Sequence, residues 1–292
     1  MHHRLDPAGS ARAAAGATLL VLAPLGLASH AAAEPSGHFT ATYDISFLGL
    51  PVGEANLAIS RDGERYALDL GAGLRGVAGF FVDGSGTATV SGRRGRTGAV
   101  SGAFHVESRY AGKPIRVAMQ IADGRARDVT VEPEPTPRAD RVPVTPQDRT
   151  GIVDPLTMLA IPAGSAPLAS GLCDRRIPVF DGASRADLVL SRGSLVTVRD
   201  GAYRGPALDC RVRWVPIAGH RANGPNVRRM AANDDMQVRL APALDGVLLP
   251  LAISVATGWG TVRIEARRWG GPDRPAEEAG RPSVKVSLPA AR

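Results

Sequence analysis

The chain has 292 residues and a formal net charge of +7, from 35 Lys and Arg against 28 Asp and Glu. Lys113 and Lys285 are the only lysines, and the arginines are scattered without interleaved aromatic residues, so the charge does not predict a nucleic-acid partner. It reflects either a high-GC genome, which favours Arg codons, or an anionic partner such as lipid phosphate or an acidic glycan, with which Arg pairs bidentately.

The N-terminal segment has the three-part layout of a secretory signal peptide. Arg4 and Arg12 give a positive start, residues 13–28 form an apolar run, and residues 31–33 are three alanines that a signal peptidase can read. The run is too short to cross a bilayer as a transmembrane anchor. We therefore predict cleavage after Ala33, export to the periplasm of a Gram-negative cell, and no transmembrane segment in the mature chain.

The chain from residue 34 onward shows the signals of antiparallel strands. Apolar and polar residues alternate in segments such as 43–47, 115–121, 236–240 and 249–255, which indicates a sheet with one face in water. Asp-Gly, the pair that type I′ hairpin turns favour, occurs six times. The six pairs are Asp62-Gly63, Asp83-Gly84, Asp123-Gly124, Asp181-Gly182, Asp200-Gly201 and Asp245-Gly246.

The alternation also predicts which side chains face the interior. Because the side-chain period of a strand is two, a register error of one residue would invert a whole segment. The side chains expected to be buried are Ile115, Val117, Met119, Ile121, Leu249, Leu251, Ile253 and Val255. Those expected to be exposed are His105, Arg116, Gln120 and Arg239.

Residues 132–148 are rich in proline and charge and predict a loop between two β-rich halves, 34–131 and 149–270. We expect these halves to form one continuous β domain over 34–270. Just after the loop, Asp154 can cap a helix that has Pro155 at its first position and ends at Ala160, and this is the one short helix that we predict. Residues 271–292 are expected to be a loosely ordered tail, in which 284–288 could form a last strand.

Two cysteines, Cys173 and Cys210, are most simply interpreted as one disulfide in an exported chain. In the chain-entropy model, closing a loop of this length stabilises the fold by about 4 kcal/mol. The alternative is a metal site, but the three histidines of the mature chain, His38, His105 and His220, do not lie at ligand spacing.

The remaining motifs favour structural interpretations. Residues 71–76 match GxGxxG, but no βαβ unit surrounds them, so a strand connection is favoured over a nucleotide site. His105 falls on the polar face of a strand, and His220 falls in a turn-rich surface loop. Asp234 and Asp235 are adjacent on the approach to a strand and point to opposite faces, so they cannot act as an acid–base pair.

Arginine runs at 93–96 and 267–268 are expected on solvated turns and edges, where charge opposes edge-to-edge aggregation. The chain contains neither a GxSxG nucleophile elbow nor an HExxH helix. We therefore assign no catalytic, cofactor-binding or metal-binding residues.

Several segments resemble the landmarks of the proteobacterial family called domain of unknown function 3108. In chain order they are residues 41–53 (ATYDISFLGLPVG), Asp154-Pro-Leu-Thr157, Cys173 with Val179-Phe-Asp-Gly182, Cys210 with Val215-Pro-Ile-Ala-Gly219, and residues 249–262. The resemblance covers nearly the whole mature chain. It implies an exported β-rich domain with a cysteine pair, and it carries no assigned activity or catalytic residues.

We predict an all-β, mostly antiparallel sheet that curls into an open barrel or half-barrel. The expected function is non-enzymatic: binding an apolar or amphiphilic ligand, or a partner, in the concave face of the sheet. That face is predicted to be apolar and partly open, with arginines near its rim to meet a lipid-like or anionic envelope component. The alternatives are an envelope hydrolase of glycan or peptide that uses an unrecognised carboxylate site, and a structural interaction module with a packed interior.

Overall fold

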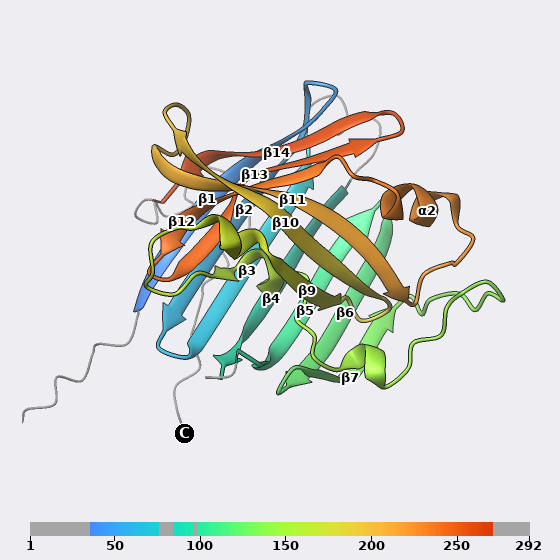
Figure 1. Ribbon diagram of the computed structural model, residues 1–292. Coiled ribbons are helices and arrows are strands. Elements are labelled where there is room, and N and C mark those ends of the chain that lie inside the picture. The colour runs from blue at the N-terminus through green and yellow to red at the C-terminus, as the bar shows by residue number, and fades with distance from the viewer. Residues whose placement is uncertain (1–35, 76–83, 96–97, 271–292) are drawn as a thin grey trace, which may run out of the picture. The chain divides into compact units, whose positions relative to one another are not determined.

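A computed structural model of the protein describes residues 36–75, 84–95 and 98–270 (Figure 1). The predicted signal peptide and C-terminal tail lie outside the described residues, as does Asp83 of the second Asp-Gly pair. Most of the described part is β-strand and the strands pair antiparallel, which confirms the predicted fold class.

Seven strands of the N-terminal half follow one another as a meander. They are β1 (Ser36–Phe47), β2 (Leu50–Asp62), β3 (Arg65–Leu74), β4 (Gly84–Arg94), β5 (Val100–Tyr110), β6 (Lys113–Ala122) and β7 (Arg125–Glu132). A second meander forms the C-terminal half. Its strands are β9 (Arg175–Phe180), β10 (Arg185–Val198), β11 (Gly205–Ala218), β12 (Met236–Leu244), β13 (Val247–Thr257) and β14 (Gly260–Trp269). The short β8 (Ile161–Pro162) pairs with the start of β13.

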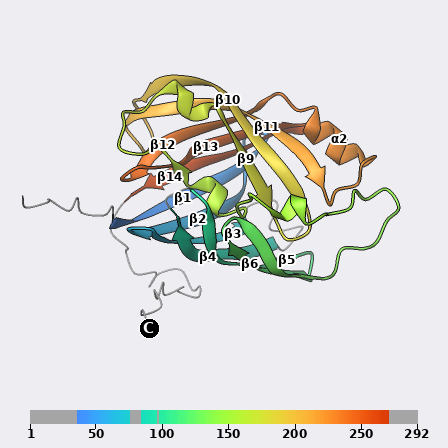
Figure 2. The ribbon, with the colours of Figure 1, turned by 60° about the horizontal axis from the view of Figure 1, so that its bottom comes forward.

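The first and last strands join the two meanders into one sheet. β1 pairs with β14 over residues 41–47, so the strand order runs β7 to β1, then β14 to β9. Figure 2 shows the C-terminal strands β10 to β13 above the N-terminal strands β2 to β6. The five Asp-Gly pairs whose two residues are both described all lie in hairpin turns, as predicted.

A segment after the proline-rich loop nearly closes the sheet into a barrel. Thr150 bridges to Arg125, the first residue of β7, and Val153 bridges to Val179 of β9. The N–H of Val153 donates to the carbonyl of Pro178 at 2.9 Å, and the N–H of Phe180 donates to the carbonyl of Val153 at 3.0 Å. Both edge strands are thereby partly covered, which reduces the number of backbone groups left unpaired at the edges.

The helix predicted at 154–160 is not an α-helix. This segment forms only one 3-10 turn, η2 (Thr157–Leu159), preceded by η1 (Gln147–Arg149), while η3 (Ser170–Cys173) follows later. Asp154 caps the turn as predicted, but Pro162 and the pairing of β8 with β13 end it after one turn. The α-helix of the described chain, α2 (Pro225–Ala231), lies between β11 and β12.

The main core lines the inner face of the N-terminal meander. Its central row consists of cross-strand neighbours that are all buried: Phe39, Ile59, Leu68, Val90, Phe104 and Met119. A second core surrounds the Cys173–Cys210 disulfide, and a third packs Leu251 with Ala207 and Ala241.

Most of the predicted faces are correct. Met119, Ile121, Leu249 and Leu251 are buried, whereas His105, Arg116 and Gln120 are exposed. Ile253, Val255 and Val117 are half-buried, and Ile115 is 41% exposed, so its prediction is wrong. Arg239 is half-buried because its guanidinium makes a bidentate pair with Asp209, at 2.6 and 2.8 Å.

The expectation of one wet face fails for β13. Val247, Leu248, Leu249 and Pro250 are all buried. The second core, which contains Ile161 and Cys173, packs on Leu248, while the main core packs on Val247 and Leu249. The chain between β8 and β9 therefore covers the outer face of this strand.

Candidate functional site

The sheet has two ends with different surroundings. At one end, which we call the pocket end, β1, β3 and β5 finish and β2, β4 and β6 begin; by antiparallel pairing, α2 and the β13–β14 hairpin lie at this end too. The opposite end, the far end, carries the β2–β3, β6–β7, β10–β11 and β12–β13 turns. In Figure 1, α2 lies at the right and the gold β10–β11 hairpin at the left.

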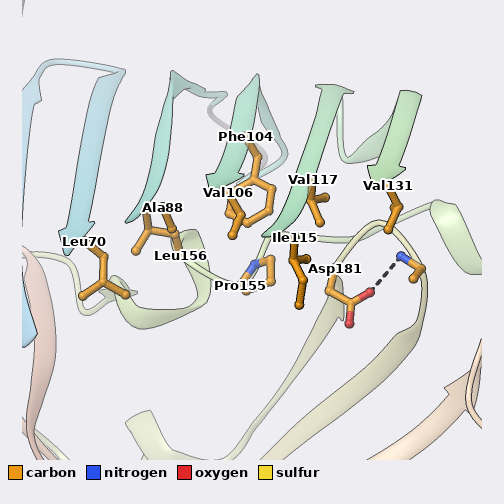
Figure 3. A pocket seen from close by; sticks show the side chains of 11 residues that line it. Leu70, Ala88, Phe104, Val106, Ile115, Val117, Val131, Pro155, Leu156 and Asp181 are labelled. Carbon is orange, nitrogen blue, oxygen red and sulfur yellow. Dashed lines mark hydrogen bonds between the residues drawn. The ribbon is translucent and has the colours of Figure 1, made fainter. Parts of the chain in front are cut away.

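An apolar pocket of about 350 Å³ lies on the inner face of the N-terminal meander (Figure 3). Its floor is one row of cross-strand neighbours on β3 to β7: Leu70, Ala88, Val106, Val117 and Val131. The row is displaced by two residues from the buried row that contains Phe104, so the same face that forms the core also forms the pocket.

The pocket is open toward the pocket end, where three of the four residues in the next row are small. The next row on the same face contains Ala72, Gly86, Ser108 and Ile115, and none of these four is buried. Ile115 lines the pocket at this margin, which explains why an inward-facing residue is 41% exposed. The interior is therefore filled near the far end and accessible near the pocket end.

Pro155 and Leu156 line the pocket from the segment that closes the barrel. Asp154, which is fully buried, holds this segment: its Oδ1 accepts the N–H groups of Leu156 at 2.9 Å and Thr157 at 2.8 Å. Burial raises the pKa of Asp154, and these hydrogen bonds oppose the rise. Its Oδ2 has no hydrogen-bond partner among the described residues. The cap therefore fixes the position of Leu156, while the other carboxyl oxygen is buried without a hydrogen-bond partner in the described part of the chain.

The turn after β9 forms the side wall. Asp181 accepts the N–H groups of Ala183 at 2.8 Å and Ser184 at 2.6 Å, together with the Ser184 hydroxyl at 2.9 Å. Gly182 has a φ of +100°, and a Cβ there would lie 2.7 Å from Cγ1 of Val117. Only glycine lets this turn approach the floor so closely.

Charge is sparse in the pocket. Among the described residues that line it, Asp181 is the charged one, so the predicted arginine rim does not appear in the lining. The carboxylate of Asp181 already binds its own turn. A second carboxyl group, which a glycosidase-type acid–base pair would need, is not among these lining residues.

The residues singled out in the sequence do not gather at one site. His105 is exposed on the outer face of β5, and Asp234 and Asp235 are exposed before β12. The described part of the GxGxxG match, residues 71–75, consists of the end of β3 and one following residue, in agreement with a strand connection. Arg93 pairs with Glu64 at 3.1 Å on the surface, and Arg267 faces Asp44 and Glu54.

Cys173 and Cys210 form the predicted disulfide, with their Cα atoms 5.5 Å apart. The bond ties η3, just before β9, to β11 within the second core. It lies on elements that approach the far end, away from the apolar pocket, and its place in the core indicates a structural role.

His220 lies in a second, polar pocket of about 420 Å³, which sequence analysis missed. The pocket is formed by Arg141 of the proline-rich loop, Ser184 and the connection that leads into α2. His220 is half-buried rather than on an open loop, and Arg141 donates to the carbonyl of Gly219. Arg221 pairs with Asp140 at 2.9 Å, so these charges tie the proline-rich loop to the β11–β12 connection.

The described residues contain no cluster of three or more His, Cys, Asp or Glu side chains that could hold a metal ion. Within the same part of the chain, no helix has the length and apolar character needed to cross a membrane.

A family model described as "Protein of unknown function (DUF3108)" matches residues 42–267, and the chain belongs to this family. A search among curated proteins finds no match. Among solved structures, the chain is similar to a β-barrel-like protein of domain of unknown function DUF1849 from Brucella abortus. That similarity covers 82% of this chain and 98% of the other, at 10% sequence identity and a TM-score of 0.46.

Proposed function

We propose that this protein is a non-enzymatic periplasmic binding protein that takes the apolar chain of an amphiphile into the pocket on its inner face. The supporting observation is the pocket itself: a floor of five aliphatic side chains and a second wall from Pro155 and Leu156, open toward one end of the barrel. Sites for small ligands are characteristically concave and mostly apolar, with few polar groups. The proposal includes export by the signal peptide, with cleavage after Ala33.

The polar head of such a ligand would lie at the open margin. Lys113 is exposed and lies two residues before Ile115 on β6, so the two side chains share one face of the strand. A carboxylate or phosphate head could meet Lys113 while the chain contacts Ile115 and Val117. In this proposal Lys113 provides the positive charge that the sequence analysis assigns to arginines at the rim.

The hydrolase alternative has less support. Asp154 combines burial with a raised pKa, a combination that also occurs in catalytic acids. Here Asp154 is completely buried, and its Oδ1 is engaged by two backbone N–H groups of its own turn. A group in this position acts on the fold of the segment and does not reach a substrate.

Binding of a fluorescent fatty acid, competed by phospholipid, tests the proposal. Ala88→Phe would fill the pocket from its floor and should abolish binding at micromolar protein. Thr87→Phe is the matched control, because Thr87 is exposed on the opposite face of the same strand and should leave binding unchanged.

Two results would contradict the proposal. One is the absence of probe binding to the wild-type protein at micromolar concentration, and the other is equal binding by wild type and Ala88→Phe. Native mass spectrometry of protein purified from a periplasmic extract provides a second readout, since a bound amphiphile would add a discrete mass. Intact mass would also show whether the mature chain begins at Glu34.

A further inference from the structure

Large apolar side chains that face solvent concentrate at the pocket end. Among the described residues, those with substantial exposure are Leu48, Leu50, Tyr110, Ile115, Leu195, Ile217 and Trp259. All except Leu195 lie at or within a few residues of the strand ends that define the pocket end. Single exposed apolar residues are ordinary on a protein surface, so the feature to be explained is that six of the seven gather at one end.

Two neighbouring hairpins carry the most exposed of these residues. Leu48 is 63% exposed in the β1–β2 turn, and Trp259 is 75% exposed in the β13–β14 turn. The turns are adjacent, because β1 pairs with β14 and the N–H of Leu48 donates to the carbonyl of Thr261 at 3.3 Å. We call these two turns, with Leu50, the apolar tips.

The backbone conformation at position 48 is sterically unfavourable for leucine. Leu48 has a φ of +53° and is followed by Gly49 at +79°, the conformation of a turn that favours Asn or Asp at its first position. A leucine there bears the steric cost of the left-handed region and remains mostly exposed. Part of its side chain packs on Gly260 of the β13–β14 turn, where an added Cβ would overlap Cδ2 of Leu48, and the exposed remainder can contact an apolar surface outside the protein.

Positive charge accompanies the apolar tips. The Arg229 guanidinium of α2 lies 5.3 Å from the ring centroid of Trp259. Arg228 lies beside it in α2, and Lys113 follows the β5–β6 turn at the same end. Tryptophan and tyrosine side chains favour the level of lipid headgroups, and each basic residue near an anionic bilayer adds roughly 1 kcal/mol of attraction.

From these observations we infer that the pocket end docks on the surface of a lipid bilayer that contains anionic headgroups, with the apolar tips inserted at the headgroup level. A bilayer fits better than a protein partner because the apolar residues project from several separate turns rather than from one continuous face. A fluid lipid surface accepts such an arrangement without shape complementarity. Docking would also bring the pocket mouth to the membrane, although the inference does not depend on what the pocket binds.

Flotation with vesicles tests the inference. The purified protein should float with vesicles of equimolar phosphatidylglycerol and phosphatidylcholine, and much less with phosphatidylcholine alone. Leu48→Asn together with Trp259→Ser should reduce the bound fraction by about tenfold, as expected for the loss of one or more large apolar contacts. Leu195→Ser is the matched control, because Leu195 is 56% exposed but lies ten residues along β10 from its pocket-end start.

The inference is overturned if the wild type does not float, if the double variant floats as well as the wild type, or if Leu195→Ser loses binding equally. Sedimentation velocity tests the other possible partner of the apolar tips, a second copy of the chain. A dimer that dissociates on the Leu48 and Trp259 substitutions, without vesicle binding, would assign the apolar tips to a second copy of the chain. Asn suits the turn at position 48, and a melting temperature of the double variant close to that of the wild type would exclude misfolding as the cause of lost docking.

Discussion

Both ends of the barrel carry tight turns between antiparallel strands, but the residues in these turns differ between the two ends. At the far end the β2–β3, β6–β7, β10–β11 and β12–β13 turns all contain Asp-Gly. At the pocket end the short turns contain Leu48-Gly49, Ala111-Gly112 and Gly258-Trp259, while Asp181-Gly182 forms the pocket wall. The charged turns suit contact with water, and the exposed apolar turns at the other end are the basis of the docking proposal.

The packing of the barrel interior also differs between the two ends. Toward the far end it is filled by buried side chains such as Met119 and Ile121, and the disulfide ties the adjoining elements. Toward the pocket end, most residues of the inner face are the small residues alanine, glycine and serine. The interior is not filled there, and the pocket opens. Under the proposed function, stability and binding therefore lie at opposite ends, and the substitutions below test the two parts of this comparison.

The largest effect is expected from the disulfide. Replacing Cys173 and Cys210 by serine should lower the free energy of unfolding by about 4 kcal/mol, because the unfolded chain regains the entropy of the opened loop. Denaturant unfolding measures this loss. Binding of the fatty-acid probe by the remaining folded protein should be unchanged. Loss of binding without unfolding would contradict the view that the disulfide affects stability alone.

Asp154→Ala should cost about 3 kcal/mol, since two buried N–H groups, of Leu156 and Thr157, lose their acceptor. Asp154→Asn retains an acceptor oxygen and should cost clearly less. Thermal and denaturant unfolding of both variants provide the comparison. Equal loss in the two would mean that the cap does not hold the segment that carries Leu156.

The pH dependence of stability follows from the raised pKa of Asp154, whose first cause is burial. A carboxyl group with a pKa raised in the folded state contributes stability that is fully present below its unfolded pKa, about 3.8, and is lost as pH rises through the folded value. The contribution of Asp154 should therefore fall as pH increases above 4. Subtracting the profile of Asp154→Asn from that of wild type isolates it, and a difference that rises with pH would contradict the assignment.

The smallest effects come from exchanging the turn chemistry of the two ends. Leu48→Asn should stabilise the protein by about 0.5 kcal/mol, because Asn tolerates positive φ better than Leu. Asp123→Leu, in a turn of the same conformation at the far end, should destabilise it by about 1 kcal/mol and also remove the contact between Asp123 and Ser101. Thermal unfolding measures both. Opposite signs would support the comparison, and stabilisation by Asp123→Leu would contradict it.

Local chemistry made part of this structure predictable. Asp-Gly pairs identify hairpins because the turn depends on two residues alone, whereas Leu48-Gly49 and Gly258-Trp259 carry no such signal. The disulfide was predictable because the chain has two cysteines. The α2 helix was not predicted because its seven residues give too little periodicity.

The pocket could not be predicted from single strands. Its floor joins Leu70, Ala88, Val106, Val117 and Val131, and only the register of five strands places these residues in one row. Alternation assigned Ile115 to the inner face, but whether that face is covered depends on where Pro155 and Leu156 pack. Tertiary contacts decide whether an inward-facing side chain is covered, and for this reason the exposure of Ile115 could not be predicted from the sequence.

Photo-crosslinking with a fatty acid that carries a diazirine at the end of its chain would test most directly whether the pocket end receives an apolar ligand. Mass spectrometry of the digested adduct locates the attached residues. We expect attachment to the floor and margin of the pocket, at Ala88, Val106, Ile115 or Val117, with competition by phospholipid. Attachment around Leu195 and the far-end turns, or none above the level seen with Ala88→Phe, would contradict the account.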